Sequence, residues 1–185
     1  MIPDRDTADA IPIRRTGPDD VREEEQTIMR LRKAAAEDTE KLIAIRIDFL
    51  ADHTGCLDED VESHLRLQLS RYYKDHLNRD FFAWIAEDDE RFVSSFFMTV
   101  TERPANTRVT NGRLATINNV FTYPEYRRNG LAASLFEKIL AEAREQNVTD
   151  VELVASRDGR PLYEKFGFTP IEDTYMRHEV DYQRL

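Results

Sequence analysis

Residues 119–132, with the sequence NVFTYPEYRRNGLA, constrain the fold of this chain more than any other stretch. Residues 120–123 are β-branched or aromatic, which favours a strand, and Pro124 ends that strand. Apolar residues then recur at helical spacing on one face, namely Leu131, Leu135, Phe136, Ile139, Leu140 and Ala143. The stretch therefore predicts a strand, a short turn and a helix that begins near Gly130.

The predicted turn places two arginines and a glycine at the N-terminus of a helix. The first turn of a helix carries unpaired N–H groups and the positive end of the helix dipole. Gly130 lets a ligand approach this backbone, and Arg127 and Arg128 add charge that does not titrate away. This combination favours a phosphate or pyrophosphate ligand, with a simple junction and solvated arginines as the alternative.

The motifs and the composition exclude several classes of protein. A Walker A loop is excluded because no Gly-Lys-Ser/Thr follows the turn, and a dinucleotide-binding fingerprint is excluded because Gly130 is the only glycine there. The net charge of −10 argues against a nucleic-acid partner, and Cys56 is the only cysteine, so no intrachain disulfide forms. The His and Cys residues show no metal-binding spacing, so we expect no metal site.

The length and the N-terminal composition predict one folded domain with a tail. A chain of 185 residues suits a single domain, which we place at residues 27–185. Residues 1–26 lack periodicity, which predicts a flexible tail, with an ordered arm that covers a partner subunit of a homodimer as the alternative. No apolar run has transmembrane length and no signal-peptide core is found, so we expect a cytoplasmic protein without a membrane partner.

The hydrophobic pattern predicts strands and helices along residues 28–180. Apolar runs predict strands at 28–32, 81–86, 91–101, 113–123, 148–155 and 176–180, with a polar turn at 87–90. Helical spacing predicts helices from Asp38 or Thr39 to Gly55, over 58–77, over 130–147 and from Pro161 to Gly167. We expect the apolar faces of the first two helices to pack in the core, namely Leu42, Ile45, Phe49, Leu50, Val61, Leu65, Leu69, Tyr73 and Leu77.

Residues 127–132 resemble the signature of the GNAT superfamily of N-acetyltransferases, Gln/Arg-x-x-Gly-x-Gly/Ala. Arg127, Gly130 and Ala132 fit its fixed positions, and the run Leu-Tyr-Glu-Lys-Phe-Gly-Phe at 162–168 resembles the second hallmark of that family. The resemblance implies an α/β (α+β) GNAT acyltransferase fold, with a mixed central sheet that is splayed in the middle and flanked by helices.

The same resemblance implies a ligand and a site. The acyl donor would be acetyl-CoA, whose pantetheine arm pairs with the strand before the turn and whose pyrophosphate lies in the turn. Ser156 stands where the family commonly has an Asn, and Tyr163 would be the catalytic residue that protonates the leaving thiolate. The implied cofactor-binding residues are Val120, Phe121, Thr122, Arg127, Arg128, Asn129, Gly130, Leu131, Ala132 and Ser156.

The residues that bind the acetyl acceptor and take its proton stay open. Asn118 and Asn119 are suited to hold a water but are not bases, and Asp48 and Asp52 are either ligands of a cationic acceptor or solvated helix acids. Three titratable side chains are candidates on their chemistry alone, namely Glu102, His53 and His64. We expect an N-acetyltransferase that acts on an amine of a small molecule or peptide by direct attack. The alternative is a non-catalytic acyl-CoA-binding sensor or regulatory module.

Overall fold

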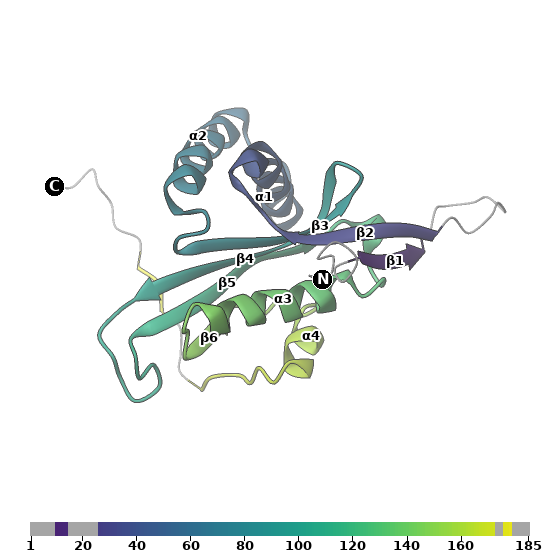
Figure 1. Cartoon of the computed structure of the whole chain (residues 1–185). Coiled ribbons are helices and arrows are strands. Elements are labelled where there is room, and N and C mark those ends of the chain that lie inside the picture. Colours follow the sequence, from purple (N-terminus) through teal and green to yellow (C-terminus); the bar gives the residue numbers. More distant parts are fainter. Residues whose placement is uncertain (1–9, 15–25, 173–175, 179–185) are drawn as a thin grey trace, which may run out of the picture. The chain divides into compact units, whose positions relative to one another are not determined.

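The computed structural model describes residues 10–14, 26–172 and 176–178 (Figure 1). Contacts group the chain into two compact units, Met1–Val154 and Ala155–Leu185, where the sequence predicts one body at 27–185. The first unit contains a β-sheet and most of the helices. None of the described helices is both long enough and apolar enough to cross a membrane.

A six-stranded mixed sheet forms the centre of the first unit (Figure 1). Its spatial order follows the chain, and neighbouring strands are antiparallel except for the last pair, which is parallel. The strands are β1 (Ala10–Arg14), β2 (Gln26–Lys33), β3 (Phe81–Asp88), β4 (Arg91–Glu102), β5 (Arg113–Thr122) and β6 (Asp150–Leu153). The helices are η1 (Ala36–Asp38), α1 (Thr39–Thr54), α2 (Glu59–His76), η2 (Pro124–Tyr126) and α3 (Leu131–Glu145), with α4 (Arg160–Lys165) in the second unit. This mixed, flanked sheet confirms the expected fold class.

Helices cover both faces of the sheet, with α1 and α2 on one face and α3 on the other (Figure 1). Consecutive residues of a strand point to opposite faces. Phe81 and Ile85 of β3 belong to the core cluster that includes α1 and α2, whereas the Trp84 indole donates to Glu142 of α3 at 3.4 Å. The apolar run at 81–86 is therefore buried between two layers of helices, as its sequence predicts.

The first two helices begin and end close to the predicted residues. Asp58 caps α2, because its carboxylate accepts a hydrogen bond from the Asp60 N–H at 2.9 Å. On the predicted apolar stripe of α2, Tyr73 is buried and Leu65, Leu69 and Leu77 are partly buried. The prediction is wrong for Val61, which is 50% exposed in the first turn of the helix.

The polarity of residues 87–90 predicts a turn, but Glu87 and Asp88 are buried at the end of β3. The prediction is wrong because each carboxylate has a partner that is distant in sequence. Glu87 accepts hydrogen bonds from Arg32 and Lys41, and Asp88 accepts one from the Tyr126 hydroxyl. The turn itself is confined to residues 89–90.

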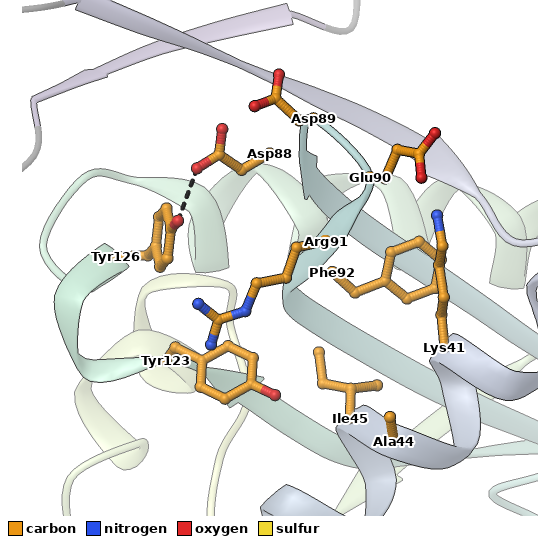
Figure 2. A pocket seen from close by; sticks show the side chains of 10 residues that line it. All are labelled: Lys41, Ala44, Ile45, Asp88, Asp89, Glu90, Arg91, Phe92, Tyr123 and Tyr126. Carbon is orange, nitrogen blue, oxygen red and sulfur yellow. Dashed lines mark hydrogen bonds between the residues drawn. The ribbon is translucent and has the colours of Figure 1, made fainter.

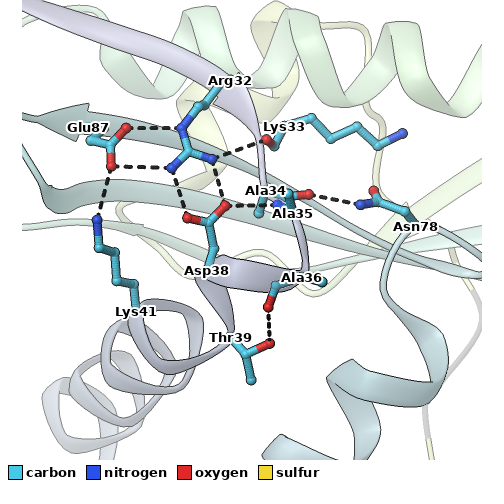
Figure 3. A network of polar contacts seen from close by, with 10 residues as sticks. All are labelled: Arg32, Lys33, Ala34, Ala35, Ala36, Asp38, Thr39, Lys41, Asn78 and Glu87. Atoms are coloured by element: carbon cyan, nitrogen blue, oxygen red, sulfur yellow. Dashed lines mark hydrogen bonds and ion pairs between the residues drawn. The ribbon is translucent and has the colours of Figure 1, made fainter.

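Arg32 lies at the centre of an ion cluster that joins β2, β3 and the start of α1 (Figure 3). Its Nη1 and Nη2 donate to Asp38 at 2.6 and 2.9 Å, and its Nε and Nη2 donate to Glu87 at 3.0 and 3.2 Å. Asp38 also accepts the Ala35 N–H at 2.8 Å, and Lys41 of α1 donates to Glu87 at 3.3 Å. The cluster thereby fixes where α1 begins relative to the sheet.

The last two predicted strands differ from the structure. β6 extends only over Asp150–Leu153, shorter than the predicted 148–155. Residues 176–178 have no regular structure, and the remainder of the predicted strand at 176–180 lies outside the described residues. Gly167 follows α4 with a φ of 85°, which agrees with its predicted role at the end of that helix.

A strand lies within the segment whose sequence predicts a flexible tail. β1 pairs antiparallel with β2, where Pro12 lies opposite Ile28, and Ile13 is only 2% exposed. The prediction is wrong for residues 10–14, because five residues with a proline carry little periodicity and their order comes from pairing with β2. Residues 1–9 and 15–25 lie outside the described part of the chain.

We expect Ile13→Ala to lower the free energy of unfolding by about 2 kcal/mol or more, because it removes a buried side chain and leaves a cavity. Ile28→Ala is the matched control, since Ile28 is 66% exposed on the paired strand and should change stability by roughly 0.5 kcal/mol or less. Urea unfolding of the three proteins measures the difference. Equal stability of the two variants would show that β1 contributes no packing.

Candidate active site

β5 loses its parallel neighbour halfway along its length. β6 pairs with β5 only from Leu114 to Ile117, whereas β4 still pairs with β5 at Thr122. Among the residues that the structure describes, no strand pairs with the other edge of residues 118–122. Such an edge offers backbone N–H and C=O groups to an extended ligand.

A β-bulge lies at the start of this unpaired edge. Asn119 and Val120 together lie opposite the single residue Phe96 of β4, and Asn119 has a φ of 48°, which Asn tolerates better than most residues. The Asn119 amide is buried, donates to the Ser95 hydroxyl at 2.8 Å and accepts from Arg46 at 3.2 Å. Two other elements therefore hold the bulge in place.

The N-terminus of α3 presents backbone N–H groups at an open surface. Gly130 precedes the helix with a φ of 79°, and no side chain caps the helix there. The Ser134 N–H bonds to the Gly130 carbonyl at 3.1 Å, whereas the N–H groups of residues 131–133 precede the first intrahelical bond. A Cβ added at Gly130 would meet nothing within 4 Å, so a ligand has room to approach. Arg128 is exposed beside this opening.

Side chains of the loop between β5 and α3 fix its shape. The hydroxyl of the buried Tyr126 donates to Asp88 at 2.6 Å. Arg127 Nε donates to the Thr122 carbonyl at 2.8 Å, and the Asn129 amide donates to the carbonyls of Tyr126 and Arg127 at 3.3 and 3.2 Å. The loop therefore has a defined geometry in this structure.

The unpaired edge of β5 and the N-terminus of α3 are joined by residues 123–130 within the first unit. Val120, Phe121 and Thr122 lie on the edge, and residues 127–132 surround the helix start, as the sequence predicts. An extended amide-bearing arm suits the edge, and a pyrophosphate suits the helix start with its arginines. The residues present therefore fit acetyl-CoA.

A family model for the acetyltransferase (GNAT) domain matches residues 56–185 of this chain. The chain belongs to the GNAT acetyltransferase family. Among solved structures, a predicted acetyltransferase with acetyl-CoA from Clostridium acetobutylicum is 30% identical, with a TM-score of 0.72. The match covers 85% of this chain and 98% of that chain.

Two further acetyltransferases share the fold of this GNAT chain. Glucosamine-6-phosphate N-acetyltransferase from Arabidopsis thaliana is 18% identical, with a TM-score of 0.59 and coverage of 83% of this chain and 99% of that one. Ribosomal-protein-alanine N-acetyltransferase from Brucella melitensis biovar Abortus 2308 is 17% identical, with a TM-score of 0.61 and coverage of 82% and 99%. These identities show the fold and not the acceptor. A comparison with curated protein sequences found no match.

The GNAT chain has a cavity of about 670 Å³ between α1, the turn after β3 and the residues that follow β5 (Figure 2). Lys41 and Ile45 of α1 line it, together with Arg91 and Tyr123. The Arg91 guanidinium lies 4.4 Å from the centroid of the Tyr123 ring. Burial and the nearby Asp48 carboxylate raise the pKa of Tyr123 to about 12, so its hydroxyl keeps its proton at neutral pH.

The two acids of α1 that are candidates for binding an acceptor both have partners. Asp48 accepts a hydrogen bond from the Tyr123 hydroxyl, and Asp52 lies 3.8 Å from Nη2 of Arg127. Both residues are also exposed, so the alternatives of ligands for a cationic acceptor and solvated helix acids both stay open. Both carboxylates contact the segment that links β5 to α3.

Ser156 and Tyr163 lie together in the second unit. The Ser156 hydroxyl accepts the Gly159 N–H at 3.1 Å. A Cβ at Gly159 would lie 3.0 Å from the Tyr163 hydroxyl oxygen and 3.1 Å from the Ser156 oxygen, so a glycine leaves room for both side chains. Tyr163 is 6% exposed, and burial raises the pKa of its hydroxyl, which favours the protonated form that a proton donor needs.

The three candidate bases lie on separate elements. Glu102 at the end of β4 is exposed and pairs with Arg113 at 2.5 Å. His53 of α1 packs beside Phe49, with 4.5 Å between ring centroids, and His64 is exposed on α2. The structure does not assign the acceptor's proton to any of them.

Ser94 and Ser95 of β4 lie behind the bulge, and the sequence pattern does not predict their roles. The Ser94 hydroxyl donates to the Phe121 carbonyl at 2.9 Å and lies 2.7 Å from the Thr122 hydroxyl, and Ser95 holds Asn119. In the sequence, these two serines stand within an otherwise apolar strand. This pattern predicts that their hydroxyls are buried but does not predict which groups they contact.

Proposed function

We propose that this chain is an acetyl-CoA-dependent N-acetyltransferase that transfers the acetyl group to an amine of a small molecule or peptide by direct attack. The observation that carries the proposal is the unpaired, bulged end of β5, which is joined by a short fixed loop to an uncapped helix N-terminus. A cleft that only buried an acyl chain would need neither feature.

Acetyl-CoA supplies an activated acetyl thioester when bound. The backbone of Val120, Phe121 and Thr122 would pair with its pantetheine amides, as a sheet edge pairs with an added strand. The N–H groups at the start of α3 and the exposed Arg128 would bind the pyrophosphate. A backbone N–H near Phe121 would polarise the acetyl carbonyl, as in an oxyanion hole.

Two proton transfers remain for the chain's own residues. The acceptor must lose a proton before its nitrogen can attack, and Asn118, which is exposed on β5, is suited to hold a water for that step. Asn119 is less suited, because Arg46 and Ser95 already occupy its amide. Tyr163 would donate its proton to the departing sulfur.

We expect Gly130→Val to weaken acetyl-CoA binding by at least tenfold, because the branched side chain fills the space that the pyrophosphate needs and costs charge-assisted hydrogen bonds. Gly55→Val is the matched control: Gly55 also has a positive φ, 84°, and open space around an added Cβ, but it follows α1. Both variants carry backbone strain, so the comparison isolates the ligand. Isothermal titration calorimetry gives both affinities, and normal binding by Gly130→Val would remove the loop from the donor site.

The experiment that tests the function is release of free thiol from acetyl-CoA with a panel of amines, amino acids, polyamines and peptides. We expect thiol release above the background of hydrolysis with at least one class, together with an acetylated product by mass spectrometry. Binding of acetyl-CoA without any transfer would contradict the proposal and support the non-catalytic sensor instead.

A further inference from the structure

Arg46 of α1 is a partly buried cation without an acidic partner. Its guanidinium donates to the Asn119 amide oxygen at 3.2 Å and lies 5.3 Å from the centroid of the Phe49 ring. Within the part of the chain that the structure describes, no carboxylate forms an ion pair with it. Burial lowers the pKa of Arg46, because no acid compensates for the lost solvent. Most of its N–H donors are available to a ligand.

The other two partly buried arginines in the described ranges are neutralised. Arg32 pairs with Asp38 and Glu87, and Arg113 pairs with Glu102 at 2.5 Å. A partly buried charge without a counter-charge lowers stability, so Arg46 does not behave as a structural ion-pair residue. Its surroundings are those expected for a cation that pairs with an anionic ligand.

The position of Arg46 places that partner next to the proposed reaction. Asn119, which Arg46 contacts, begins the bulge, and Phe121 lies two residues further along β5. Two residues of strand span roughly 7 Å. An anion on Arg46 would therefore lie within the length of a small molecule from the acetyl group. The pairing of a guanidinium with a carboxylate is bidentate and directional, which suits the orientation of a small acceptor.

We propose that Arg46 binds the carboxylate of the acetyl acceptor, so that the acceptor is an amino acid or another small amine that carries a carboxylate. This inference rests on the proposed function. Arg46 fixes one end of the acceptor, and the amine at the other end then faces the unpaired edge of β5.

Matched acceptors test this assignment. Thiol release is measured with glycine and glycinamide, β-alanine and propylamine, and lysine and cadaverine, with phosphoethanolamine and ethanolamine as the phosphate arm. We expect kcat/KM to favour the carboxylate member by about tenfold to a hundredfold, the value of a hydrogen-bonded charge. Equal use of both members, or a preference for the phosphate, overturns the carboxylate assignment while acetyl transfer itself stands.

Variants of Arg46 separate binding from a structural role. We expect Arg46→Gln to bring the ratio of acid to neutral acceptor close to one, and Arg46→Lys to retain part of the preference. The melting temperature of Arg46→Gln should stay at the parent value or rise, because an uncompensated charge is removed. A lower melting temperature with equal losses for both members of each pair would show that Arg46 only supports Asn119.

A second readout separates this inference from the proposed function. In the presence of CoA, the carboxylate acceptors should raise the melting temperature of the parent protein and not that of Arg46→Gln. If no acceptor turns over, this shift decides: a shift confined to the carboxylates and lost in Arg46→Gln supports the site, and any other pattern overturns it. Failure of acetyl-CoA itself to bind contradicts the proposed function.

Discussion

Replacement of Arg32 by methionine should lower the free energy of unfolding by about 3–5 kcal/mol, because it leaves the buried Asp38 carboxylate without its ion-pair partner and the buried Glu87 carboxylate with Lys41 alone. The side chains of Asp38 and Glu87 are only 5% and 8% exposed, and Arg32 binds both. Arg66→Met is the control, since Arg66 forms an exposed ion pair with Glu62 on α2 and should contribute roughly 0.5 kcal/mol or less. Urea unfolding at pH 7 measures both changes.

The same cluster predicts how this difference depends on pH. The hydrogen bond from Arg32 lowers the pKa of Asp38. Burial alone would raise the pKa of Glu87, but Arg32 and Lys41 outweigh it, so that this pKa is lowered too. A lowered pKa contributes stability above the unfolded values of about 3.8 and 4.5, and this stability is lost as the pH falls through the folded values. The difference in the free energy of unfolding between the parent protein and Arg32→Met should therefore be smaller at pH 3 than at pH 7. An equal difference at both pH values would contradict the stabilising role of the ion cluster.

Removal of the Tyr163 hydroxyl, as Tyr163→Phe, should lower turnover by roughly ten- to a thousandfold, which overlaps the usual contribution of a positioned acid, about a hundred- to ten-thousandfold. The substitution keeps the buried ring and deletes only the hydroxyl that we propose as the proton donor. Affinity for acetyl-CoA should change little, because the proton transfer matters mainly in the transition state. Steady-state kinetics and calorimetry of the same protein give both values.

Tyr72→Phe is the matched control for this substitution. Tyr72 is partly buried, and burial raises its pKa as it does that of Tyr163, but Tyr72 lies on α2, where it stacks on His76 with 4.3 Å between ring centroids. We expect its turnover to match the parent. If Tyr163→Phe also turns over at the parent rate, Tyr163 is a packing residue and water protonates the thiolate.

The local part of the site was predictable because its residues are neighbours in sequence. Residues 113–145 form the predicted strand, turn and helix. They were predictable because the spacing of apolar residues changes from that of a strand to that of a helix between Pro124 and Gly130. The unbroken apolar run at 81–86 likewise identifies a buried strand. In each case the information lies within one element.

Long-range partners account for what could not be predicted. Glu87 can be buried because its carboxylate accepts a hydrogen bond from Arg32, which lies 55 residues earlier in the sequence. β1 is ordered because it pairs with β2. Asn119 fits a strand in sequence, and only Ser95 and Arg46 show that it forms a bulge with a positive φ. The sequence around Arg46 shows only a charged residue on a helix. That this charge is partly buried without an acidic partner becomes clear only from its neighbours in the fold. Each of these features depends on contacts between elements.

Hydrogen–deuterium exchange with and without acetyl-CoA tests the central claim most directly, namely that the edge of β5 and the start of α3 bind the donor. We predict slower exchange in peptides that cover residues 118–123 and 127–134, with no change in peptides from residues 60–72 of α2. Protection confined to other segments, or no protection at saturating acetyl-CoA, would contradict the account.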